Sequence, residues 1–245
     1  MVGRIDKRKL QKKFLRRELH DILEAEIVSG NLLPGARLSE DAVAAQYGVS
    51  RSPAREALQD LERDGFAERV GFRDRQVLTP TEEFIRNIYD VWNILQVGRT
   101  YLASMRTSPA NNKELRDLHR QTGEALAARD ENGYRILSKK FHRLLDRPCD
   151  NDHLDRMVSD YRKYIAWFDA LYYNYSNDVS VGRWKEHGAI LAAYARRDLV
   201  GITEAISVHV NTHRDKVLQR WRHAQPPLEA KARGNLTGRA LKKAS

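Results

Sequence analysis

Two sets of residues have types and spacings that could support chemistry. The first comprises Ser50, Arg51, Ser52, Arg55 and Gln59, at the start and on the outer face of a predicted helix. Hydroxyl groups and helix N-terminal amides suit phosphate oxygens. Arginines at these positions can each donate two hydrogen bonds to O6 and N7 of a guanine. The set therefore favours contact with DNA, and the alternative is that these side chains only solvate an exposed face.

The second set consists of histidines. The sequence contains eight, and His142, His187 and His209 each lie on a different predicted helix. Imidazoles that converge from three helices can form an open site for Zn²⁺, Ni²⁺ or a similar ion. The alternative is that each histidine is structural or exposed, as lone histidines usually are.

The first set needs a particular arrangement of elements to position it. Apolar residues spaced three and four apart predict a helix over about 9–29, and further helices are predicted over 39–47 and 51–64. Gly48 and Val49 form the break before the third helix, and Ser50 is expected to cap that helix. Two β-like runs, 66–70 and 76–78, flank a polar turn and predict a hairpin. Helix, tight turn, helix and hairpin are typical of a winged helix-turn-helix.

The second set needs a helical scaffold. Helical patterns cover about 81–106, 110–128, 131–147, 152–175, 183–196 and 199–222, and no strand pattern follows residue 80. The predicted fold is mainly α: a winged helix-turn-helix followed by an all-α antiparallel bundle. The predicted divisions are a basic arm (1–9), a winged helix-turn-helix (10–79), an all-helical domain (80–224) and a disordered basic tail (225–245).

Composition excludes several classes of protein. No stretch approaches the roughly 18 uncharged apolar residues of a membrane helix, and the N-terminus has no apolar run typical of a signal peptide. The single cysteine, Cys149, rules out a disulfide framework, so we expect a cytoplasmic protein without membrane attachment. The net charge is +10, and residues 1–17 hold eight Lys/Arg against one acid. This arm either adds phosphate affinity regardless of sequence or is a solvated tail.

The first half carries a specific resemblance. The runs 32–40 and 48–58, together with Leu61 and Asp64-Gly65, closely resemble the GntR superfamily of bacterial transcription regulators. The helical half is similar to the FadR-type branch, whose effector domain is called FCD. The resemblance implies that Arg51 and Arg55 read bases. It also implies that the hairpin tip, including Arg73 and Arg75, enters the minor groove.

Two positions depart from the family pattern. Asp41 stands where the family usually has an arginine that contacts DNA, so that contact is either lost or replaced by a salt bridge to a neighbour. Asp74 stands where the wing usually has glycine, and an aspartate can still adopt a left-handed turn conformation.

The FCD resemblance also bears on the histidines. His142, His187 and His209 fall at that family's three histidine ligand positions, but the usual aspartate ligand is Ser138 here. Asp146 and His213 are alternative fourth ligands, and the sequence leaves open whether a divalent metal (Zn or Ni) is bound.

The resemblance further implies an effector site in the helical domain. Trp92 replaces a common arginine that binds effector carboxylates, and Arg183 could supply the positive charge instead. The expected effector contacts are therefore Trp92, Ser138 and Arg183. The aromatic-rich segment 161–175 fits core and dimer packing or, alternatively, a pocket wall.

These expectations combine into one functional hypothesis. The chain is predicted to be a ligand-responsive regulator, a repressor of a catabolic operon that binds an inverted repeat in double-stranded DNA as a homodimer. A small metabolite, such as an organic, sugar or aromatic acid, would release it. The alternatives are an architectural DNA-binding protein and a metal-dependent hydrolase. No His-Glu-x-x-His pair, phosphate loop or Gly-x-Ser-x-Gly elbow supports an enzyme.

Overall fold

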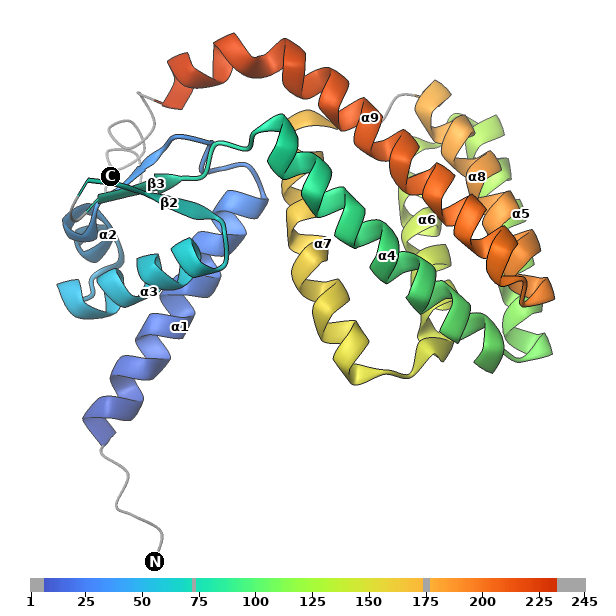
Figure 1. Ribbon diagram of the computed structural model, residues 1–245, viewed down its shortest axis with the longest axis horizontal. Coiled ribbons are helices and arrows are strands. Elements are labelled where there is room, and N and C mark those ends of the chain that lie inside the picture. The colour runs from blue at the N-terminus through green and yellow to red at the C-terminus, as the bar shows by residue number, and fades with distance from the viewer. Residues whose placement is uncertain (1–6, 72–73, 174–176, 233–245) are drawn as a thin grey trace, which may run out of the picture. The chain divides into compact units, whose positions relative to one another are not determined.

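The computed structural model describes residues 7–71, 74–173 and 177–232 (Figure 1). Its helices are α1 (Lys7–Val28), α2 (Glu40–Tyr47), α3 (Arg51–Arg63), α4 (Glu82–Arg106), α5 (Pro109–Ala127), α6 (Glu131–Asp146), α7 (Asp152–Tyr172), α8 (Asn177–Arg196) and α9 (Leu199–Ala232). The strands are β1 (Arg37–Leu38), β2 (Ala67–Val70) and β3 (Asp74–Val77). This mainly helical architecture confirms the predicted fold class.

The chain forms two compact units. The first comprises Met1–Thr81, Ala166–Tyr172 and Arg220–Ser245, and the second comprises Glu82–Ile165 and Tyr173–Gln219. The predicted boundary between residues 79 and 80 therefore lies two residues early. The sequence also gave no sign that Ala166–Tyr172, at the end of α7, groups with the first unit.

In the first unit, α1 and α3 pack through apolar faces. Leu23 and Ile27 of α1 are buried, as are Ala54, Leu58 and Leu61 of α3. The two helices are also joined at their polar edges. Arg16 donates to both carboxylate oxygens of Asp60, and Nε2 of His20 lies 2.8 Å from Oδ2 of Asp64. This packing fixes α3 with its opposite face outward.

The link between α2 and α3 follows the predicted turn. The hydroxyl of Ser39 caps α2 by accepting a hydrogen bond of 3.1 Å from the amide of Ala42. Gly48 ends α2 in the left-handed conformation, with φ 65°, which glycine adopts without steric cost. Ser50 takes the predicted N-cap position of α3, but without a side-chain capping hydrogen bond.

The strands form one antiparallel sheet with the order β1-β3-β2. The two-residue strand β1 was not predicted, because two residues are too few to show an alternating pattern. Asp74 was expected to accommodate the turn, but it begins β3, opposite Val70, and Gly71 provides the positive φ of 82°. Asp74 instead pairs with Arg37. Phe72 and Arg73 lie outside the described residues.

The second unit is built from helices, and no strand follows β3 in the described part of the chain. Helices α4 and α9 run alongside each other (Figure 1), joined by Asn93 and Ser207, whose Nδ2 and Oγ lie 3.1 Å apart. Helices α5 and α8 are joined by a reciprocal contact. Nε1 of Trp184 donates to the carbonyl of His119 at 3.0 Å, and the two rings stack 5.0 Å apart.

Two helix boundaries differ most from the prediction. Helix α8 begins at Asn177 rather than near residue 183, and α9 continues to Ala232 although a disordered tail was expected from residue 225. Pro226 and Pro227 suggested a stop, because proline lacks a backbone donor and its ring crowds the preceding turn, but a helix can pass through a proline with a bend. Residues 233–245 of the expected tail lie outside the described residues. Among the described helices, none has an apolar stretch long enough to cross a membrane.

Candidate functional site

An exposed line of side chains runs along α3. Arg51, Arg55 and Gln59 are spaced four residues apart, so they share one face, and all three are exposed. The opposite face is buried against α1. We call these three residues the α3 stripe. They offer guanidinium and amide groups, which pair with guanine and adenine edges in a major groove.

The two serines beside the stripe differ from each other. Ser50 is exposed at the start of α3, and its hydroxyl makes no capping bond. Ser52 is half-buried, and its hydroxyl donates to Oε1 of Glu56 at 3.2 Å. Ser50 is thus open to a phosphate, whereas Ser52 is already engaged.

Asp41 forms an ion pair with the first residue of the stripe. Nε of Arg51 lies 2.6 Å from Oδ1 of Asp41, and Nη2 lies 3.2 Å from Oδ2. Of the two outcomes expected at this position, the structure has the salt bridge to a neighbour. The neighbour is itself a predicted base-reading residue.

Arg75 requires a correction. It was predicted to contact DNA from the wing, but its side chain is only 3% exposed and points into the first unit. Its Nε donates to Oε2 of Glu62 at 2.7 Å, and Nη1 lies 3.9 Å from Oε1 of Glu40. A buried guanidinium held by two carboxylates cannot reach a phosphate in this conformation. Arg73, the other predicted wing contact, lies outside the described residues.

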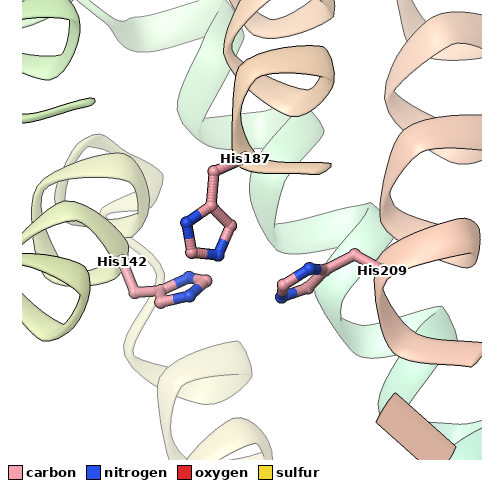
Figure 2. Close-up of side chains that lie close together, drawn as sticks. All are labelled: His142, His187 and His209. Carbon is pink, nitrogen blue, oxygen red and sulfur yellow. The ribbon is translucent and has the colours of Figure 1, made fainter. Parts of the chain in front are cut away.

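In the second unit, three imidazoles converge. Figure 2 shows His142 from α6, His187 from α8 and His209 from α9 pointing toward a common space. Each offers a ring nitrogen within 4.8 Å of the others, and the ring centroids of His142 and His187 are 4.6 Å apart. We call these three residues the histidine cluster. Their convergence confirms the geometric prediction, while their role as metal ligands stays a prediction.

The environment keeps the cluster neutral. Burial and the positive charges of Arg183 and Arg162 lower the pKa of His142 to about 3. Burial likewise lowers the pKa of His187 and His209 well below the ordinary value, with further lowering by Arg183 and the neighbouring imidazoles. Neutral imidazoles are the form that can ligate a metal.

Both nitrogens of His209 have partners. Its Nδ1–H donates to Oε2 of Glu186 at 2.8 Å, which leaves the lone pair on Nε2. Nη2 of Arg183 donates to that lone pair at 3.1 Å. The same guanidinium lies 5.8 Å from the ring centre of Tyr173. A cation therefore stands at the edge of the cluster, beside an aromatic face.

The remaining predicted residues lie in different places. Ser138 is half-buried one turn before His142 on α6, and Trp92 is half-buried on α4. In the described part of the chain, no hydrogen bond or ring contact joins Trp92 to the histidine cluster.

Neither alternative fourth ligand joins the cluster. Asp146 is buried and pairs with Arg99, whose Nη1 lies 3.0 Å away. Burial raises the pKa of Asp146 to about 6 against the opposing effect of Arg99 and Arg162. His213 contacts Tyr89, with Nδ1 3.2 Å from the phenol oxygen, and its ring lies 4.4 Å from that of Tyr173.

Sequence reasoning missed two members of this region, Glu186 and Tyr173. Glu186 precedes His187 directly, which on one helix places it on a different face, and its partner His209 comes from another helix. Tyr173 lay within the aromatic-rich segment that was noted, where Trp167 and Phe168 are fully buried core residues. Only the tertiary structure distinguishes Tyr173, which lies beside Arg183 and His213, from those core residues.

Comparison with known proteins identifies both parts of the chain. Residues 15–73 match the gntR family of bacterial regulatory proteins, and residues 87–212 match the FCD domain. The chain is 26% identical over 199 residues to the HTH-type transcriptional regulator YdhC of Bacillus subtilis, covering 79% of this chain and 87% of the relative. It is 43% identical over 76 residues to the gluconate operon transcriptional repressor of the same organism, covering 30% of each.

Among solved structures, the fold is similar to that of E. coli McbR/YncC. The TM-score is 0.61 at 20% identity, and the match covers 84% of this chain and 98% of that one. These findings confirm the resemblance that the sequence motifs carried. The chain is therefore a transcription regulator of the gntR family, and its helical second part is an FCD domain.

Proposed function

We propose that this regulator is a repressor that binds an inverted-repeat operator as a homodimer and dissociates when its FCD domain binds a small organic acid. The α3 stripe carries the DNA part of the proposal, because it is the exposed face of the helix that a helix-turn-helix places in the major groove. Repression is supported by the similarity of a 76-residue stretch of the chain to a gluconate operon repressor.

The DNA part is tested with variants of α3. The operator is first found by selecting duplexes from a randomised library with the full chain. Arg51→Ala and Arg55→Ala should each weaken binding to the selected duplex by about 1–3 kcal/mol, and weaken binding to random duplex less. Arg120→Ala is the control, since it removes one exposed positive charge from α5 in the second unit, where Arg120 already pairs with Glu124. Equal losses on both duplexes for the stripe variants would overturn base reading.

The effector part rests on Arg183. Its guanidinium lies beside three neutral imidazoles and the ring of Tyr173, an arrangement that suits a carboxylate attached to an apolar or cyclic body. A ligand that binds only the folded state raises the melting temperature. Citrate, gluconate and benzoate represent organic, sugar and aromatic acids. At least one should stabilise the wild type and the control Arg143→Gln, but not Arg183→Gln. Equal stabilisation of all three proteins would place the acid elsewhere.

The residues of the cluster also fit a divalent metal. Nε2 of His187 is buried and has no hydrogen-bond partner among the described residues, which is unfavourable unless another group engages it. His142, His187 and His209 would hold Zn²⁺ or Ni²⁺, and the metal would supply an open position for an effector oxygen. Arg183 would have to release Nε2 of His209 first.

The competing functions are weaker. The curated relatives are named transcription regulators, so the chain is not an enzyme. An architectural DNA-binding protein would have no use for a buried histidine cluster with a cation at its edge. The proposed regulator acts in the bacterial cytoplasm, where its DNA target lies.

A further inference from the structure

We propose that Asp41 is a specificity-determining residue for DNA recognition: it holds one edge of the Arg51 guanidinium and leaves the opposite edge for a guanine. The inference rests on the proposed function, because it requires α3 to enter the major groove. It assigns a role to an acid on a surface that must approach a polyanion.

The geometry of the ion pair decides which donors remain. A guanidinium has five N–H donors in a fixed plane. Asp41 engages the side edge, formed by Nε and Nη2, at 2.6 and 3.2 Å. The end edge keeps one hydrogen on Nη1 and one on Nη2, and the second Nη1 hydrogen points back toward Cδ. That edge is the fork that pairs with O6 and N7 of guanine.

The benefit of the pair is orientation rather than stability. The two side chains are 74% and 67% exposed, so the ion pair contributes little to folding. A free arginine side chain, however, loses conformational entropy when it is fixed. Asp41 reduces that loss, because it holds Arg51 in one orientation before DNA arrives.

The position of Asp41 makes it a suitable anchor. It lies in the first turn of α2, where the helix dipole favours a negative charge. The two residues before it are fixed: Ser39 caps the helix, and Glu40 faces the buried Arg75. The carboxylate therefore has a defined place relative to α3.

Arg55 provides an internal contrast. Its side chain is exposed, and among the described residues no hydrogen bond or ion pair holds it. A restrained arginine is expected to donate hydrogen bonds to one type of base in one geometry, whereas an unrestrained arginine can adapt to several types of base. The two arginines should therefore differ in selectivity.

The test is in vitro selection from a randomised duplex library, with the full chain as wild type, Asp41→Asn and Glu18→Gln. Glu18 is exposed on α1, so Glu18→Gln controls for the loss of one negative charge from the same unit. We expect the wild type and Glu18→Gln to select the same guanine in each half-site. Asp41→Asn should reduce the preference for that one guanine about 5- to 10-fold and leave the other positions unchanged.

A double-mutant cycle then assigns the effect to Arg51. On duplexes that differ only at that guanine, Asp41→Asn should alter discrimination in the wild-type background and leave it unchanged in Arg51→Ala. The inference is overturned if Asp41→Asn keeps the full preference, or if it has the same effect in both backgrounds. Selection of no sequence by the wild type would overturn the proposed function and this inference together. A selected sequence with an unaffected Asp41→Asn overturns the inference alone.

Discussion

Replacing Arg183 with glutamine should increase the affinity of the histidine cluster for Zn²⁺. In the wild type, Nη2 of Arg183 occupies the lone pair of His209 Nε2 at 3.1 Å, and a metal must displace it. A hydrogen bond to a charged group contributes about 1.5–3 kcal/mol. At 1.4 kcal/mol for each tenfold change, removal of this competitor corresponds to roughly a 10- to 150-fold gain in affinity. Removing the positive charge near a divalent ion acts in the same direction.

The affinity is measured by competition with a chelator at pH 7.5, together with the metal content of the purified protein. Arg143→Gln is the matched control, because Arg143 is an exposed cation beside His142 on α6. His187→Ala in the Arg183→Gln background removes one ligand and should abolish the gain. The reasoning is refuted if Arg183→Gln and Arg143→Gln bind Zn²⁺ equally, or if the gain survives the loss of His187.

Three further outcomes are expected. Ser138→Asp should also tighten Zn²⁺ binding in the same competition assay, since it adds a carboxylate one turn before His142; unchanged affinity would mean that position 138 does not reach the metal. Arg75→Ala should destabilise the first unit by about 2 kcal/mol, because Glu62 and Glu40 lose their shared cation. Faster hydrogen exchange in β3 and α3 would reveal this loss. Weaker DNA binding with unchanged exchange would instead indicate that Arg75 contacts DNA. The second unit should lose stability in acid: unfolded His142 takes up a proton below about pH 6.5, whereas the folded residue, with its pKa of about 3, does not. Its share is about 2 kcal/mol by pH 5, measured as the pH dependence of urea unfolding, and His142→Gln should remove it.

Local patterns were sufficient for most of the helices and for the turn between α2 and α3. Apolar spacing predicted the buried face of α3. Gly48 predicted the end of α2, because glycine adopts the left-handed conformation there without steric cost. The convergence of the three histidines was also anticipated, because each lies on a separate helix at a position that the family resemblance identified.

The partners of charged side chains could not be anticipated in the same way. Arg75 looks like an exposed wing residue in the sequence, and only the sheet register turns it inward toward Glu62. Asp146 has the right spacing from His142 to be a ligand, but Arg99 from another helix takes its carboxylate. Such pairings depend on how helices and strands far apart in the chain pack together, which residue spacing does not encode.

The acid on the reading surface bears on how the regulator is distributed in a cell. A genome offers about 10⁶–10⁹ competing non-specific sites, and binding to them depends mainly on positive charge near phosphates. In the proposed complex, Asp41 would offset one positive charge beside the groove, where an arginine would strengthen attachment to any sequence. A larger share of the molecules would then stay free to find the operator. Occupancy of the operator depends on the ratio of the affinity for the operator to the affinity for other sequences. Weaker non-specific binding can therefore increase the occupancy of the operator.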